Sequence, residues 1–211
     1  MPNYQIKIQK DLIHEMPIVQ FPGPIYVIDS MLNVRAAIAT LRKHKIVGFD
    51  TETRPSFKKG RMHSIALVQL STKEEAFLFR VNKIGMPAAL ADLLSYEIIM
   101  KVGLSVHDDF NQLHRSFPGL KPQGFVDIQD EVKKYKIADI SLQKVYAILF
   151  GKKISKSQQL TNWEAEQLDK GQCSYAAIDA LACIHIHEHL AKGLFDPEQS
   201  PYKVYPEEEA E

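Results

Sequence analysis

The sequence predicts one α/β domain, with a mixed five-stranded sheet flanked by helices and a helical C-terminal half. Short apolar runs alternate with helical periodicity in the first half of the 211 residues, and helical periodicity alone fills the second half. The length suits one well-buried domain. Hydrophobic residues make up 45% and charged residues 25%, as in ordinary globular proteins.

The elements follow in order from these patterns. A helix is expected over 30–43, where apolar residues recur at helical spacing. The strands are expected at 46–52, 64–70, 76–81, 98–103 and 125–128. Further helices are expected at 87–95, 106–117, 128–136, 141–150 and 172–191. We therefore divide the chain into a turn-rich lead-in (1–24), a folded domain (25–195) and an acidic tail (196–211), of which residues 206–211 are expected to fray.

The charge balance and the cysteines limit the class of protein. Basic and acidic residues number 26 each, which disfavours a tight duplex binder but not an enzyme whose bound cations meet the phosphate. Cys173 and Cys183 are expected roughly 15 Å apart on one helix, too far for a disulfide. We therefore interpret them as reduced core residues of a cytoplasmic protein. The longest stretch without Asp, Glu, Lys or Arg, 16–28, has 13 residues and three prolines, so we expect no membrane association.

The first candidate site is the pair Asp50 and Glu52 at the end of an apolar strand. Alternate side chains of a strand share a face, so Gly48, Asp50 and Glu52 point the same way. Carboxylates this close raise each other's pKa and are unfavourable unless a cation lies between them. The alternative is a chance Asp-x-Glu that faces solvent at a strand end.

The second candidate lies on the expected helix 106–117. Its apolar residues form one stripe at helical pitch, and Asp109 borders that stripe, whereas Asp108 points almost to the opposite side. Only Asp109 can lean into a pocket beside the core. The alternative is that both acids stabilise the start of the helix. Asp127, at the end of the fifth strand, is expected to cap the following helix.

The third candidate is Asp179, in a helix that is apolar on nearly every side. An ionised carboxylate there costs several kcal/mol unless a positive group compensates it. Tyr175 lies one turn earlier on the same face. The alternative to a metal ligand is a buried ion pair with a lysine or arginine from elsewhere.

The three candidate sites together predict a metal centre. Four carboxylates that converge on one pocket suit two divalent cations about 3.5–4 Å apart, the arrangement used for displacement at phosphorus. Carboxylate oxygens are the ligands that Mg²⁺ or Mn²⁺ prefers. Tyr175 stays protonated at neutral pH and is expected to orient the attacking water.

These residues resemble the motifs of the DEDD superfamily of 3′–5′ exonucleases, in its tyrosine-containing (DEDDy) branch. The first motif is Val47-Gly-Phe-Asp-Thr-Glu52, the second Gly103-Leu-Ser-Val-His-Asp-Asp-Phe-Asn-Gln-Leu113, and the third Tyr175-Ala-Ala-Ile-Asp179. The segment 155–163 is similar to the Werner-helicase exonuclease domain and to ribonuclease D. The resemblance covers about residues 25–195. It implies a ribonuclease-H-like fold, two metal ions, and Asp50, Glu52, Asp109 and Asp179 as metal ligands, with Tyr175 in the catalytic set.

Candidate contacts to nucleic acid come from basic clusters and aromatic residues. Thr53 follows the first-motif glutamate where relatives often carry an aromatic or bulky residue, so base stacking must come from elsewhere. A basic cluster before the third motif is the best candidate for phosphate contact, although such clusters also occur on solvated surfaces. The candidates are Thr51, Phe57, His107, Lys152, Lys153 and Lys156.

The sequence therefore predicts an exonuclease that shortens single-stranded DNA or RNA from the 3′ end to nucleoside monophosphates. DNA and RNA both fit, because the contact to the 2′-hydroxyl that separates them is not readable here. Two alternatives stay open: a non-catalytic module of the same fold that binds nucleic acid or protein, and a hydrolase of very short oligonucleotides.

Overall fold

The computed structural model describes residues 3–56 and 63–206. Within these ranges the strands are β1 (Gln5–Ile6), β2 (Ile25–Ile28), β3 (Ile46–Thr53), β4 (Ile65–Ser71), β5 (Ala76–Phe79), β6 (Met100–Gly103), β7 (Phe125–Asp127) and β8 (Lys203–Val204). The helices are α1 (Lys10–His14), α2 (Met31–Leu41), α3 (Val81–Ile84), α4 (Ala88–Leu94), α5 (Val106–Ser116), α6 (Ile128–Lys133), α7 (Leu142–Phe150), α8 (Lys170–Ala191) and the 3-10 turn η1 (Pro197–Gln199).

The central sheet is mixed, and its described strands lie in the order β2-β5-β4-β3-β6-β7. β3, β4 and β5 pair antiparallel, whereas β2 with β5, β3 with β6, and β6 with β7 pair parallel. The α/β class and the helical second half are confirmed. The expected count of five strands is wrong, because β2 adds a sixth strand at the edge beside β5.

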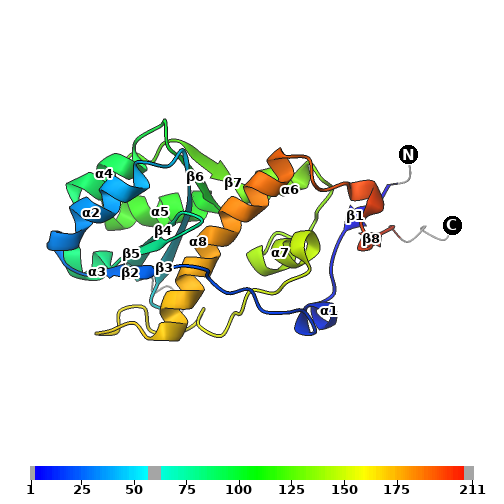
Figure 1. Cartoon of the computed structure of the whole chain (residues 1–211), viewed down its shortest axis with the longest axis horizontal. Coiled ribbons are helices and arrows are strands. Elements are labelled where there is room, and N and C mark those ends of the chain that lie inside the picture. The colour runs from blue at the N-terminus through cyan, green and yellow to red at the C-terminus, as the bar shows by residue number, and fades with distance from the viewer. Residues whose placement is uncertain (1–2, 57–62, 207–211) are drawn as a thin grey trace.

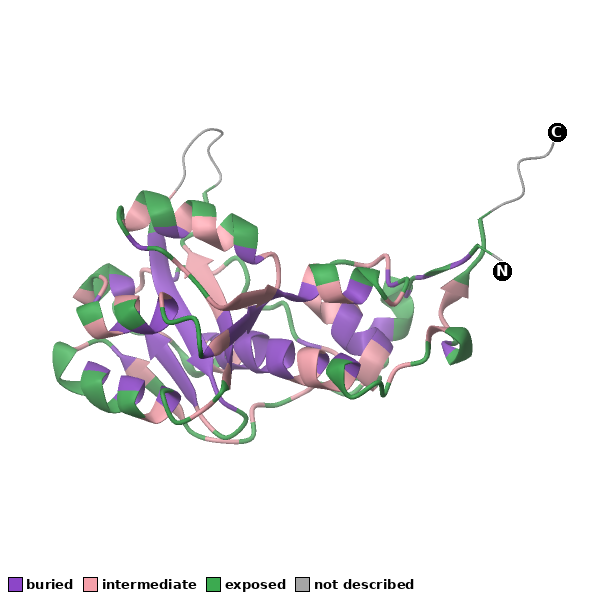
Figure 2. Cartoon of the chain, turned by 90° about the horizontal axis from the view of Figure 1, so that it is seen from above, coloured by how far each residue is buried: buried purple, intermediate pink, exposed green. Residues whose placement is uncertain are grey.

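Helices cover both faces of this sheet. Val47 and Phe49 of β3 lie in one core cluster with apolar residues of α2, α4 and α5. α8 crosses the opposite face, with α7 beside it (Figure 1). The strands between these layers are largely buried (Figure 2). The buried helix expected over 172–191 is therefore confirmed as α8.

α8 lies unusually close to β3 because of Gly48. A Cβ at this position would lie 1.9 Å from the carbonyl oxygen of Ala180. Only glycine permits so close an approach of helix and strand. The close contact brings the middle of α8 to the end of β3, where the acidic residues lie.

Residues 3–24, the N-terminal strap, connect parts of the fold that are distant in sequence. β1 pairs with β8, so the described ends of the chain lie side by side (Figure 1). Isolated bridges join Ile6 to Ile137 and Ile18 to Lys153. Ile6, Ile8 and Ile13 are buried in the core cluster that includes α7 and α8.

Two expectations concern the ends and the environment of the chain. The sequence predicts that residues 206–211 fray, but 207–211 lie outside the described residues. In the described part of the chain, the helices lack the combined length and apolarity needed to cross a bilayer.

Candidate active site

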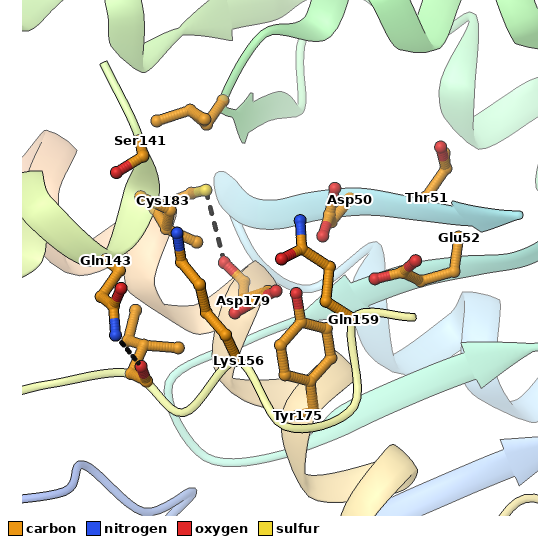
Figure 3. A pocket seen from close by; sticks show the side chains of 13 residues that line it. Asp50, Thr51, Glu52, Ser141, Gln143, Lys156, Gln159, Tyr175, Asp179 and Cys183 are labelled. Atoms are coloured by element: carbon orange, nitrogen blue, oxygen red, sulfur yellow. Dashed lines mark hydrogen bonds between the residues drawn. The ribbon is translucent and has the colours of Figure 1, made fainter. Parts of the chain in front are cut away.

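Three carboxylates meet at the end of β3. Asp50 and Glu52 extend from the face of β3 that α8 covers, and Asp179 extends toward them from α8 (Figure 3). One ligand oxygen from each of the three lies within 4.8 Å of the others. Asp179 is buried, whereas Asp50 and Glu52 are half-buried. The structure thus brings together residues that are 129 positions apart in the chain.

Asp109 lies beside this group rather than within it. Its carboxylate accepts a hydrogen bond from the hydroxyl of Thr51, which lies between Asp50 and Glu52 in the sequence of β3. The charge of Asp109 still helps to raise the pKa of Glu52, and that of Asp50 raises the pKa of Asp109. The fourth carboxylate is therefore close enough to share the electrostatic field of the other three.

The start of α5 determines where Asp109 lies. Asp127 accepts hydrogen bonds from the backbone N–H groups of Ser105 and Val106, and it also caps α6. Ser105 adopts a left-handed conformation with φ of 59°, which turns the chain from β6 into α5. Asp108 is exposed and accepts a hydrogen bond from the Ser105 hydroxyl. The expected capping role of Asp127 is confirmed.

Burial raises the pKa of all four carboxyl groups in the site, and repulsion by neighbouring carboxylates adds to this shift for Asp50, Glu52 and Asp109. Burial and the charge of Asp179 hold the pKa of Asp50 well above its usual range. Burial, with the charges of the other three, raises the pKa of Glu52 to about 10. Burial and the charge of Asp50 raise the pKa of Asp109 to about 8. Without a positive charge nearby, it is therefore unfavourable for these carboxyl groups to be ionised together.

Asp179 and Tyr175 interact across one turn of α8. Burial raises the pKa of Asp179 to about 7, although Tyr175, as a hydrogen-bonding partner, and the charge of Lys156 oppose this shift. Burial and the charges of Asp179 and Glu52 raise the pKa of Tyr175 above its usual value. The phenol therefore keeps its proton at neutral pH.

These side chains open onto a cavity of about 290 Å³. The residues that line it are Asp50, Thr51, Glu52, Leu104, Ser141, Leu142, Gln143, Ile154, Lys156, Gln159, Tyr175, Asp179 and Cys183 (Figure 3). The sequence motifs did not predict the polar groups of Ser141, Gln143 and Gln159 in this lining. Gln159 lies inside segment 155–163, which resembled known exonucleases and was the one available signal. Ser141 and Gln143 lie at the start of α7, and no sequence motif marked either residue.

The candidate nucleic-acid contacts separate into two groups. Thr51 and Lys156 line the cavity. Lys152 and His107 are exposed outside its lining, and the His107 ring packs against Phe110. Lys153 donates to the carbonyl oxygen of His14 in the N-terminal strap. Phe57 lies outside the described residues.

A family model for 3′–5′ exonuclease domains matches residues 26–194. The chain belongs to the 3′–5′ exonuclease family. The matched range contains the four carboxylates, Tyr175 and the whole cavity lining. The resemblance found in the sequence motifs is thereby confirmed at the level of the family.

Relatives and solved structures agree with this assignment. The chain is 30% identical over 194 residues to the mouse bifunctional 3′–5′ exonuclease/ATP-dependent helicase WRN, covering 87% of this chain and 14% of that protein. The Nibbler EXO domain of Aedes aegypti superposes with a TM-score of 0.72 at 23% identity, covering 83% of this chain and 92% of that one. RNase D of Trypanosoma brucei, in complex with RNA U12, gives 0.70 at 21% identity, covering 81% and 63%. These two structures support the fold.

The chain is similar to only part of its curated relatives. It spans 14%, 28% and 24% of the mouse WRN protein and of the mut-7 homologues of Aedes aegypti and human. The matched parts cover 87%, 85% and 89% of this chain.

Proposed function

We propose that the protein is a metal-dependent exonuclease that shortens single-stranded DNA or RNA from the 3′ end and releases nucleoside monophosphates. This proposal rests on one observation. One carboxylate oxygen from each of Asp50, Glu52 and Asp179 lies within 4.8 Å of the others, and Asp109 lies beside them. Membership of the 3′–5′ exonuclease family supports the reaction. The RNase D of Trypanosoma brucei was solved in complex with RNA U12, which supports nucleic acid as the substrate class.

The donor set fits divalent cations. The Asp179 oxygen Oδ1 is buried and has no hydrogen-bond partner among the described residues. A carboxylate in this position, with two more beside it, needs positive charge to stay ionised. Oxygen-only donors suit Mg²⁺ or Mn²⁺. We infer that Asp50, Glu52, Asp109 and Asp179 hold two such ions, which when bound supply a hydroxide nucleophile and stabilise the leaving oxygen.

Tyr175 contributes a neutral hydrogen-bonding group. Its raised pKa keeps the hydroxyl protonated, so it does not act as a base at neutral pH. The phenol lines the cavity next to Asp179 (Figure 3). From this position its hydroxyl orients the attacking water relative to the scissile phosphate.

The cavity supports attack on one terminal nucleotide at a time. Its volume of about 290 Å³ lies at the lower end of the ~300–1,000 Å³ typical of small-molecule pockets. Lys156 lines the same cavity and supplies a positive group to a phosphate. A net charge of zero fits contact with one strand end rather than a long duplex.

A length series of end-labelled DNA and RNA strands tests this proposal. The protein is incubated with Mn²⁺ or Mg²⁺, with EDTA, and in parallel as Asp50→Ala. We expect products that shorten in single-nucleotide steps, and no products with EDTA or the variant. Binding without shortening would instead establish a non-catalytic module, and cleavage confined to the shortest strands would establish an oligonucleotide hydrolase.

A further inference from the structure

Gln69 of β4 has a buried side-chain amide without a hydrogen-bond partner in the described part of the chain. Its side chain is 0% exposed, and neither amide atom has a partner within the described ranges. Among the buried side chains described, Gln69 alone has two unpartnered polar atoms. Buried amides are nearly always hydrogen-bonded, since leaving one unpaired lowers stability. We therefore expect the Gln69 amide to form a hydrogen bond in another state of the protein.

Gln69 lies directly opposite Asp50 in the sheet. The antiparallel register pairs the two residues, so their side chains share the face that α8 covers. Val68 and Leu70, on either side of Gln69, instead pack in the opposite core cluster. The cross-strand neighbour of Gln69 on β5 is Leu78, which is apolar.

Along β4, the side chains of Leu67 and Ser71 flank Gln69 on the same face of the sheet. Leu67 is apolar, and the Ser71 hydroxyl donates to the Thr72 carbonyl oxygen and forms no hydrogen bond with Gln69 in the described structure. Directly opposite Cβ atoms are about 4.5–5.5 Å apart, within reach of a glutamine side chain. The carboxylate of Asp50 is therefore the acceptor that the register presents to Gln69.

We propose that Gln69 is a positioning residue for the metal site, whose amide donates a hydrogen bond to the carboxylate of Asp50 when that carboxylate holds a cation. The inference rests on the proposed function, because it assigns Asp50 as a metal ligand. A ligating carboxylate keeps lone pairs for an outer donor. A neutral amide fixes its orientation without a positive charge, whereas a lysine here would compete with the cation.

The substitution Gln69→Met tests this inference, because it keeps the length of the side chain and removes both polar atoms. Metal binding is measured by calorimetric titration with Mn²⁺, and the thermal midpoint Tm is measured in EDTA. We expect Mn²⁺ affinity to fall about 10- to 100-fold, as for other outer partners of metal ligands. We also expect an equal or higher Tm in EDTA, because an unpaired amide has been removed from the core.

Two further variants complete the test. Ser71→Ala removes a buried polar group from the same face of β4, opposite Gly48, and should leave Mn²⁺ affinity unchanged. Gln69→Leu repeats the measurement with a branched side chain if the methionine variant does not fold. Unchanged Mn²⁺ affinity in a folded Gln69 variant overturns the inference and leaves the metal site intact. Failure of the unsubstituted protein to bind Mn²⁺ refutes the proposed function itself.

Discussion

The hydroxyl of Thr51 donates a hydrogen bond to the carboxylate of Asp109, and this contact joins the end of β3 to the first turn of α5. Thr51 lies between two acidic residues that face the other side of the strand. Asp109 is thereby held beside the acidic cluster, close enough for the charge of Asp50 to raise its pKa. The contribution of Asp109 to activity can be separated from that of its neighbour Asp108.

Asp109→Ala should lower kcat by about 10²- to 10⁴-fold, because the charge stabilisation that metal ions supply is worth several kcal/mol. Asp108→Ala is the matched control, since the Asp108 side chain is exposed and, among the described residues, is hydrogen-bonded to Ser105 alone. A fluorescent single strand with a quencher measures both rates. Equal losses in the two variants would show that Asp109 has no special role in the site.

Tyr175→Phe should reduce kcat by about 10- to 100-fold and leave KM nearly unchanged. The phenol interacts with charged groups, and a hydrogen bond to a charged group is worth about 1.5–3 kcal/mol. Because the pKa of Tyr175 is raised, the residual activity of the variant should follow the same pH profile as the unsubstituted protein between pH 7 and about pH 9. A change in the shape of this profile would contradict a neutral, orienting role.

The metal-free protein should become more stable as the pH falls from about 8 to about 5. Burial raises the pKa of Asp179 to about 7 and that of Asp109 to about 8 in the folded state, whereas both are about 3.9 in an unfolded chain. The folded state then holds more protons across this range, so stability is lost as the pH rises.

Thermal unfolding in EDTA measures this effect. A change of 1 kcal/mol shifts the Tm of a chain of this size by about 2–4 °C. Asp179→Asn should weaken the dependence, because it removes one of the titrating groups. Saturating Mn²⁺ should reverse the trend, since metal binding requires ionised carboxylates and is weakened at low pH. A Tm that rises with pH in EDTA would refute the repulsion described in the site.

Lys156→Ala should weaken binding of a single strand and make it less dependent on salt. Lys156 lines the cavity, whereas Lys152 is exposed outside its lining and serves as the control. Loss of one phosphate contact lowers the slope of log affinity against log salt by about 0.7 for single strands. Fluorescence anisotropy in an Asp50→Ala background measures affinity without hydrolysis. Identical salt dependence in both lysine variants would exclude Lys156 as a phosphate contact.

Most of the fold could be predicted because its elements carry strong periodic patterns. The helix α8 and the strands β3 and β4 are long and apolar enough to be recognised alone. The strand β2 was missed because it has four residues directly after a Pro-Gly-Pro turn. Its partner β5 begins about 50 positions later, so pairing rather than local pattern makes β2 a strand.

The carboxylates of the site were predictable for a different reason. Asp50 and Asp179 stand out in apolar surroundings, where a charge requires an explanation. By contrast, three lysines of one basic cluster looked alike in the sequence. Lys156 lines the cavity, but Lys153 donates to the carbonyl oxygen of His14, and only the path of the N-terminal strap separates the two.

The N-terminal strap has a consequence for how the exonuclease unit unfolds. The family match begins at residue 26, yet Ile6, Ile8 and Ile13 are buried against helices of the matched region. The backbone around Lys153 is also hydrogen-bonded to Pro17 and Val19. A protein trimmed to the matched range would expose the apolar surface that Ile6, Ile8 and Ile13 cover. It would also lose the backbone hydrogen bonds of Lys153, which lies in the same loop as Lys156. Residues 3–24 and the nuclease core therefore belong to one cooperative unit, and a cut between them should lower solubility and strand affinity together.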